Sequence, residues 1–257
     1  MNRLMLSDEL WNKVLKILKN LSVYITDNTR MVIEGILWRI RTAAPWRDLP
    51  SDFCPWTTAY NRFNAWSRKG IWNLLFEAVK NDVDLEWAFI DGSYVKAHQH
   101  ASGGIEPETS KTIGKSKGGN TTKIHMVVDS HGNPIKFDIT AGNIHDVSVA
   151  ADLLDGIEAD NVIADKGYDS DALRDGIREM DATPHIPRRR NSKKPNSDFD
   201  RELYRSRHLV ENAFAKLKHF RAIATRFDKL SRNYRSVVEI GCIFWWIKLC
   251  TRNEYRP

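Results

Sequence analysis

Apolar residues in the N-terminal part of the chain recur at helical spacing. After Ser7, a candidate N-cap, apolar positions return every three or four residues up to residue 18, and the same period reappears between residues 32 and 40. Prolines then break the period, and further helical patterns follow over 57–70 and 71–79. We therefore expect residues 1–82 to form a small, entirely helical domain that is helix-turn-helix-like.

After residue 82 the pattern changes to short apolar or alternating runs, which are typical of strands. These runs cover residues 87–90, 123–128, 135–139, 162–164 and 183–186. Helical patterns over 147–157 and 171–180 separate the later runs, and helical patterns dominate from about residue 198. Strands that first follow one another and then alternate with helices predict an α/β fold with a mixed sheet flanked by helices.

The same pattern suggests domain boundaries. We expect a second domain over 83–250, containing a basic, exposed linker over 187–198, and a frayed tail over 251–257. The apolar run 240–247 predicts a closing helix packed on the sheet, with a dimerisation surface as the alternative.

Composition narrows the choice of partner and compartment only slightly. Lys and Arg number 39 against 33 Asp and Glu, for a formal net charge of +6, which favours polyanionic partners. The 3 cysteines form no CxxC pair, so neither a zinc cluster nor a disulfide framework is indicated and a reducing cytoplasm fits. Apolar runs are too short for a signal peptide or a membrane span, so we expect no membrane association.

Asp91 and Asp165 each follow an apolar run that predicts a buried strand. If these strands are neighbours, both carboxylates reach one site, where divalent cations would relieve their repulsion. Each aspartate also fits a simple turn or capping role, and the two interpretations stay open from this pattern alone.

Glu211 is the candidate third acid. The segment 204–218 predicts one continuous helix, on which Tyr204, Arg207, Glu211 and Lys218 are spaced to share a face. The alternative is that Arg207 and Glu211 form an ordinary exposed ion pair.

At these residues the sequence resembles the DDE transposases of bacterial insertion sequences, in particular the group called IS-five. That group's helix signature of tyrosine, arginine, glutamate and lysine is matched at all four positions just named. The segments FIDGSYVKAH around Asp91 and IADKGYDS around Asp165 also resemble the family, as do TAGNIHD, PWRDLP and YNRFNAW. The similarity covers most of the chain.

The resemblance implies an RNase H-like fold with Asp91 on the first strand, Asp165 on the fourth and Glu211 on a following helix. It implies that these three acids are catalytic and hold two Mg²⁺ or Mn²⁺ ions, which suit oxygen-only ligands. The reaction implied is cut-and-paste transposition on double-stranded DNA, with cleavage at terminal inverted repeats, strand transfer into target DNA and a homodimer in the synaptic complex. A bacterial, nucleoid-associated cytoplasmic location would follow.

Other residues carry weaker expectations. Tyr204, Arg207 and Lys218 are candidate DNA contacts beside the acids. Polar residues of the third predicted helix and basic residues of the linker are further candidates for DNA binding, although ordinary solvated surfaces have the same composition. These are Asn61, Arg62, Arg188, Arg189 and Arg190. The lysines of 114–123 also fit contacts to the DNA backbone.

Three further residues are candidates for supporting the metal ligands. His145 and Asp146 follow the third predicted strand, where they would orient a water or assist the metals, but Asp146 fits equally well as a helix cap. His208, one turn before Glu211, is a candidate for the same supporting role.

Two other classes of function stay open. A silenced or repurposed transposase would bind DNA without catalysis, and a metal-dependent nuclease would cleave without joining. Intact acids at all three positions argue against the first class, whereas the acids alone do not exclude the second.

Overall fold

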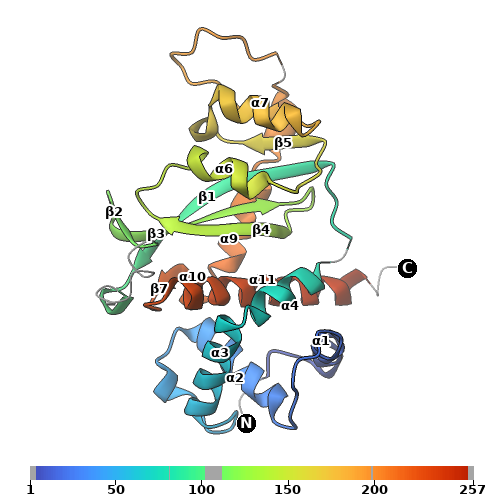
Figure 1. The fold of residues 1–257 in the computed structure, drawn as a ribbon, viewed down its shortest axis with the longest axis vertical. Helices are drawn as coiled ribbons and strands as arrows, with labels where there is room; N and C mark the ends of the chain where they lie inside the picture. Colours follow the sequence, from blue (N-terminus) through green and yellow to red (C-terminus); the bar gives the residue numbers. More distant parts are fainter. Residues whose placement is uncertain (1–3, 81, 102–111, 198, 254–257) are drawn as a thin grey trace. The chain divides into compact units, whose positions relative to one another are not determined.

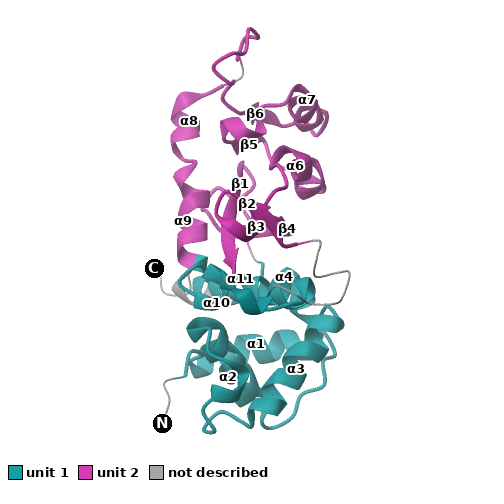
Figure 2. Ribbon diagram, turned by 90° about the vertical axis from the view of Figure 1, so that its left-hand side faces the viewer, with its two compact units in different colours: residues 1–81, 98–106, 217–257 teal, residues 82–97, 107–216 magenta. Residues whose placement is uncertain are grey.

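The computed structural model describes residues 4–80, 82–101, 112–197 and 199–253 (Figure 1). The chain divides into two compact units (Figure 2). Unit 1 comprises residues 1–81, 98–106 and 217–257, and unit 2 comprises residues 82–97 and 107–216. Within the described part of the chain, no helix combines the length and apolarity needed to cross a bilayer.

Unit 1 is helical, as its sequence period predicts. Its N-terminal elements are α1 (Asp8–Asn20), α2 (Thr29–Thr42), the 3-10 turn η1 (Trp46–Asp48), α3 (Trp56–Arg68) and α4 (Ile71–Val79). Ser7 caps α1, because its Oγ accepts the N–H of Leu10 at 3.2 Å. Gly70 separates α3 from α4 with a φ of 65°, a left-handed conformation that favours glycine.

The core of unit 1 is rich in aromatic side chains and also holds a buried ion pair. Phe63 and Trp66 of α3 are buried, and the Trp66 and Trp72 ring centroids lie 4.8 Å apart. Arg39 of α2 pairs with Asp228 at 3.3 Å, and both side chains are almost fully buried. Each charge is therefore compensated inside the helical core.

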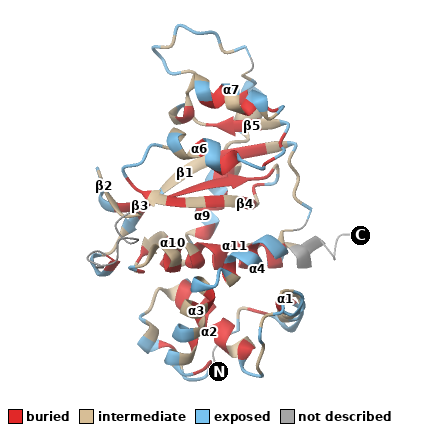
Figure 3. Cartoon of the chain, in the orientation of Figure 1, coloured by how far each residue is buried: buried red, intermediate tan, exposed pale blue. Residues whose placement is uncertain are grey.

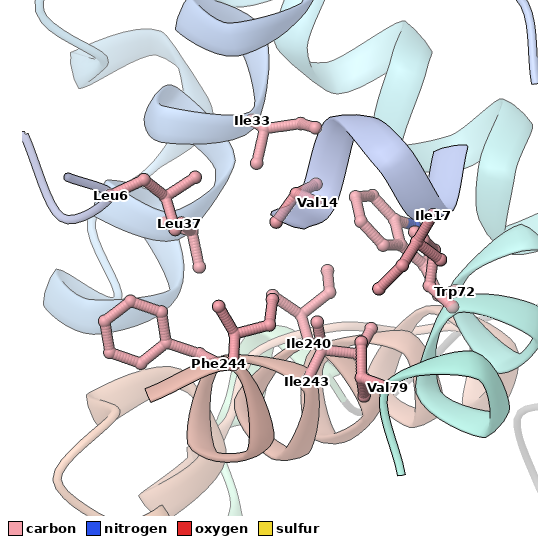
Figure 4. Close-up of a pocket in the computed structure, with 12 residues that line it drawn as sticks. Leu6, Val14, Ile17, Ile33, Leu37, Trp72, Val79, Ile240, Ile243 and Phe244 are labelled. Carbon is pink, nitrogen blue, oxygen red and sulfur yellow. The ribbon is translucent and has the colours of Figure 1, made fainter. Parts of the chain in front are cut away.

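The C-terminal elements of unit 1 are α10 (Arg221–Ala224), the short β7 (Thr225–Arg226) and α11 (Ser231–Asn253). We expected the apolar run 240–247 of α11 in the second domain, packed on the sheet. Instead α11 groups with the N-terminal helices and packs on α4 and α1. Ile240, Ile243 and Phe244 face Val14 and Ile33 across a small, entirely apolar pocket, which Val79 also lines (Figure 4).

Unit 2 is built on a mixed sheet. Its strands are β1 (Trp87–Ala97), β2 (Gly114–Ser116), β3 (Gly119–Val128), β4 (Pro134–Ala141), β5 (Asn161–Ala164) and β6 (Thr183–His185). Strand β3 pairs antiparallel with β1 on one side and with β2 and β4 on the other, whereas β5 pairs parallel with both β1 and β6. The predicted mixed sheet is thus confirmed.

Helices cover both faces of this sheet. Helices α6 (Val147–Leu154) and α7 (Asp171–Glu179) lie on one face, and α8 (Arg201–Arg205) and α9 (His208–Leu217) lie on the other (Figure 2). Because both faces are covered, β3 is buried over residues 121–128 without the alternation of a half-exposed strand (Figure 3).

Two local predictions in unit 2 are wrong. Asp91 does not end its strand, because β1 continues to Ala97 through antiparallel pairing with β3. The segment 204–218 is not one helix, because α8 ends at Arg205 and α9 begins at His208. At this break, Nδ1 of His208 donates a hydrogen bond to the backbone carbonyl of Arg205 at 2.9 Å. The side chain thus replaces the backbone N–H that would bond this carbonyl in a continuous helix.

Candidate active site

Asp91 and Asp165 lie on neighbouring parallel strands. Ile90 of β1 is in register with Ala164 of β5, so each aspartate comes directly after a residue of the same pair. Asp91 Oδ1 accepts the N–H of Gly92 at 2.7 Å. Asp165 Oδ1 accepts the N–H of Gly167 at 2.7 Å, which also caps the 3-10 turn η3 (Lys166–Tyr168). The expected proximity of the two strands is therefore present, and Asp165 additionally has the capping role.

Arg207 connects Asp91 with Glu211. Its Nη1 lies 2.9 Å from Asp91 Oδ2, and its Nη2 donates to Glu211 Oε1. Arg207 occupies the turn between α8 and α9, and Glu211 follows on the first turns of α9. The ion pair of Arg207 with Glu211 that we considered as an alternative is present, but it is half of a bridge that also holds Asp91.

The electrostatics of Asp91 reflect a crowded acidic site. Burial raises the pKa of Asp91, and the negative charges of Asp165 and Asp146 add to this effect. The N–H of Gly92 and the guanidinium of Arg207 act in the opposite direction without cancelling it. A cation close to Asp91 therefore stabilises its ionised form.

The three acids have the donor chemistry of a site for a hard divalent ion. Carboxylate oxygens are the ligands that Mg²⁺ and Mn²⁺ prefer. Among the described residues, however, no three metal-ligating side chains are grouped closely enough to hold an ion as they lie. The three acids therefore fit such an ion in their chemistry, and the Arg207 guanidinium lies between two of them, Asp91 and Glu211.

Asp146 belongs to a polar cluster on the opposite face of the sheet. Successive strand residues point to opposite faces, so Asp91 points toward Arg207 and Gly92 toward α6. Asp146 accepts from Lys123 Nζ at 2.7 Å, and its Oδ1 lies 3.2 Å from His125 Nδ1. Burial acts to raise the pKa of Asp146, but His125 and Lys123 hold it below its ordinary value.

This cluster corrects two expectations. Asp146 precedes α6 but makes no side-chain capping bond there, so the capping interpretation is wrong. Lys123 is buried beneath this surface, with 3% of its side chain exposed, so it is not a free contact for the DNA backbone. Its ammonium also lies 4.4 Å from the centre of the Tyr94 ring.

Sequence reasoning missed Lys123, His125 and Tyr168 as parts of the site's surroundings. Lys123 and His125 alternate with apolar residues in a buried strand, and this unusual pattern was an available signal. Tyr168 is fully buried in η3. Burial raises its pKa, and the charges of Asp146 and Asp91 add to the increase, which indicates that its hydroxyl stays protonated near the acids.

The two candidate supporting histidines have different surroundings. His145 is exposed, and its backbone carbonyl accepts from Ser148 Oγ at 2.6 Å. His208 uses Nδ1 at the break between α8 and α9. Their supporting roles toward a metal stay predictions.

The basic segment 187–198 is anchored rather than free within its described part. Arg188 pairs with Asp169 at 3.2 Å and with Asp171 at 2.7 Å. Asp169 Oδ2 also accepts the N–H of Arg189 at 2.8 Å. The side chains of Arg189 and Arg190 are exposed, so the structure separates an anchoring arginine from two that face solvent.

The remaining candidate DNA contacts are distributed between the units. Asn61 is exposed on α3, and the Arg62 guanidinium lies 5.5 Å from the Trp66 ring centre. The Tyr204 ring contacts Phe199 in a tilted arrangement, with ring centroids 5.2 Å apart. Lys218 follows the end of α9 at Leu217, so it does not continue the helix of Glu211, and burial lowers its pKa.

The comparisons with known proteins decide the family. The family model described as "Transposase DDE domain" matches residues 85–246, which cover most of unit 2 and part of unit 1. This chain belongs to the DDE transposases. A second family model, "Putative transposase of IS4/5 family", matches residues 6–76 and agrees with the resemblance of the N-terminal segments.

Curated relatives of this transposase come from bacterial insertion sequences. It is 38% identical over 133 residues to "Putative transposase for insertion sequence element IS6501" of Brucella ovis, a match covering 50% of this chain and 99% of the relative. It is 30% identical over 128 residues to "Transposase for insertion sequence element IS1106" of Neisseria meningitidis serogroup B, covering 47% of this chain and 44% of the relative.

A solved structure supports the fold. The piggyBac transposase in its synaptic complex with hairpin DNA matches 96% of this chain and 74% of its own, with a TM-score of 0.52 and 11% identity. At that identity the likeness concerns the fold alone. Together with the strand order, it confirms the expected RNase H-like fold of the transposase.

Proposed function

We propose that the chain catalyses cut-and-paste transposition of its own insertion element, with Asp91, Asp165 and Glu211 as the catalytic acids. The observation that carries the proposal is the arrangement of these acids. Asp91 and Asp165 follow paired residues of adjacent parallel strands, and Arg207 bridges Asp91 to Glu211. Family membership supplies the reaction class, which is DNA cleavage and strand transfer.

The three carboxylates would hold Mg²⁺ or Mn²⁺, two ions in the complete site. When bound, such ions supply Lewis-acid stabilisation of the phosphoryl oxygens. The contribution of the chain is to hold the acids on a rigid sheet and to present the scissile phosphodiester in line with the attacking group. Arg207 and Tyr204 would contact the DNA beside the acids.

The chemistry proceeds in two transfers at phosphorus. Water first attacks the phosphodiester at the element's end, the bond to the 3′ oxygen breaks, and that oxygen leaves as a 3′ hydroxyl. The 3′ hydroxyl then attacks a target phosphodiester, which forms the new joint and releases the target's own 3′ hydroxyl. Neither step needs a covalent protein intermediate, so no nucleophilic side chain is required.

The DNA-binding residues extend this proposal beyond the acids. Residues 1–82 would bind the terminal inverted repeats through the α3 surface that carries Asn61 and Arg62, and unit 2 would carry the catalytic acids. Arg189, Arg190 and Lys218 would add contacts to phosphates. Arg188 would support binding by anchoring the segment of Arg189 and Arg190 through its ion pairs with Asp169 and Asp171. The synaptic complex with hairpin DNA reported for piggyBac transposase supports DNA as the partner of this chain, and the proposal includes a homodimer in the synaptic complex.

The central test uses purified protein, Mg²⁺ and duplex DNA carrying the inverted repeats that flank the gene. We expect Glu211→Gln to lower cleavage by at least about a thousandfold while repeat binding stays within a few-fold, because the substitution removes a metal ligand and preserves shape. Glu202→Gln is the matched control, since Glu202 is an exposed glutamate of α8 paired with Arg205. Both cleavage and binding should be unchanged in the control.

Two outcomes would contradict the proposal. Cleavage that persists in Glu211→Gln would remove Glu211 from the site. Cleavage without joining by the wild-type protein would favour a metal-dependent nuclease.

A further inference from the structure

Arg207 holds two of the proposed metal ligands with separate nitrogens. Nη1 contacts Asp91 and Nη2 contacts Glu211, so the guanidinium lies between two carboxylates that belong to different elements. Arginine presents its donors in a rigid planar fork, which suits such a bridge better than the single charged group of lysine. The guanidinium thus takes the place that a cation shared by Asp91 and Glu211 would need.

The two halves of this bridge differ in how far they are shielded from solvent. Only 19% of the Asp91 side chain and 21% of the Arg207 side chain are exposed, so the pair is partly shielded from solvent. Opposite charges at 2.9 Å in such a setting attract more strongly than on an open surface. The Glu211 side chain is 54% exposed, so its half of the bridge is the weaker one.

The position of Arg207 in the chain also suits movement. Its backbone lies in the turn between α8 and α9, where its N–H donates to the Tyr204 carbonyl at 3.1 Å and its own carbonyl accepts from the N–H of Val210 at 3.2 Å. Asp91 is fixed in the middle of β1. Rotation of the long Arg207 side chain can therefore take the guanidinium away from the acids without breaking these backbone hydrogen bonds or a strand pairing. A DNA phosphate close to the acids would offer the guanidinium an alternative two-oxygen partner.

We propose that Arg207 is a substitute cation that keeps Asp91 and Glu211 closed to metal until a DNA phosphate draws the guanidinium away. The inference rests on the proposed function and adds regulation to the same site. It makes metal binding and DNA binding mutually reinforcing, because each event removes the competitor of the other.

The test measures Mn²⁺ affinity from the electron paramagnetic resonance signal of free Mn²⁺, with and without the repeat-bearing duplex. For the wild-type chain we expect affinity to rise by about tenfold or more when DNA is bound, within the usual range of coupling between sites. Arg207→Gln should bind Mn²⁺ at least several-fold more tightly than wild type without DNA, and DNA should then add little. Arg205→Gln, an exposed arginine of α8, is the matched control and should behave as wild type.

Three further measurements keep the outcomes distinct. The repeat-bearing duplex without protein gives the baseline for Mn²⁺ held by the DNA itself. Arg207→Lys keeps the positive charge, so it should still compete in part with Mn²⁺ for Asp91 and Glu211. This variant allows the test to be made even if Arg207→Gln is unstable. Asp91→Asn should abolish the protein-dependent binding.

Equal or weaker Mn²⁺ affinity in Arg207→Gln, with coupling to DNA retained, would overturn the inference while leaving the metal site in place. Mn²⁺ binding that survives Asp91→Asn would instead overturn the proposed metal site itself.

Discussion

At the scale of single residues, the position next to Asp91 has no room for a side chain. Gly92 follows Asp91 and points to the opposite face, where the Asp146 carboxylate lies above it. A Cβ at Gly92 would stand 2.2 Å from Asp146 Oδ1, closer than any real contact permits. The glycine next to Asp91 is therefore required by packing, not by a turn.

Gly92→Ala tests this requirement. We expect a loss of about 1–3 kcal/mol in the free energy of unfolding, because the carboxylate of Asp146 must move away from Lys123. Gly176→Ala is the matched control, since nothing lies within 4 Å of a Cβ at this position inside α7. The control should gain up to about 1 kcal/mol from helix propensity. Urea unfolding of both variants gives the comparison, and equal effects would contradict the packing argument.

At the scale of elements, interruptions between helices and ion pairs within loops decide which charged side chains meet. The interruption between α8 and α9 places Arg207 in a turn rather than on a helix face, and from there it reaches Asp91. The segment after β6 shows the same principle, because Asp169 and Asp171 anchor Arg188 while Arg190 faces solvent. Basic residues that look equivalent in the sequence therefore have different tasks.

Arg188→Ala and Arg190→Ala should separate these tasks. Replacing Arg190 should weaken DNA binding and reduce the slope of log affinity against log salt by about one, as expected for one lost phosphate contact. Replacing Arg188 should instead speed amide hydrogen exchange in residues 186–197, because the ion pairs with Asp169 and Asp171 are lost. Hydrogen exchange and salt-dependent binding assays read out the two effects. Identical behaviour of the variants would contradict the division.

At the scale of the whole molecule, the C-terminal helix has a place that its sequence position does not suggest. Helix α11 packs on α4 and lines the apolar pocket together with α1, so the end of the chain completes the core of unit 1. This packing buries Glu239 almost completely. A buried carboxyl group in such a core makes the stability of the whole chain depend on pH.

Burial raises the pKa of Glu239 from 4.5 to about 7; Arg235 and Ser236 oppose the increase, and Glu77 adds to it. Between these pH values the folded chain keeps a proton that the unfolded chain releases. The unfolding free energy should therefore fall as pH rises through this window, and the loss is complete above about pH 7. Glu239→Gln removes the titrating group, so its advantage over wild type should grow to as much as about 3 kcal/mol at pH 8.

Chemical denaturation from pH 4 to pH 8 measures that difference. Comparing the variant with wild type at each pH cancels the contributions of all other titrating groups. A difference that does not change with pH would contradict the assignment to Glu239.

The amino-acid sequence by itself determined the helical N-terminal region and the order of strands and helices, and it supplied the three acids as candidates. These follow from local periodicity and from segments that resemble a family, and both are properties of neighbouring residues. The end of β1 was predicted wrongly because its extension depends on pairing with β3, which is distant in the sequence.

Only the tertiary structure decided which charges meet. Arg207 and Asp91 are separated by 116 positions, and Lys123 and Asp146 by 23, so no local pattern pairs them. Asp91 and its neighbour Gly92 point to opposite faces of β1, so Arg207 pairs with Asp91 on one face and the buried Lys123 pairs with Asp146 on the other. The break before α9 is what lets Arg207 reach Asp91. Charges pair through space, and the fold brings these residues close enough for attraction to outweigh the cost of burial.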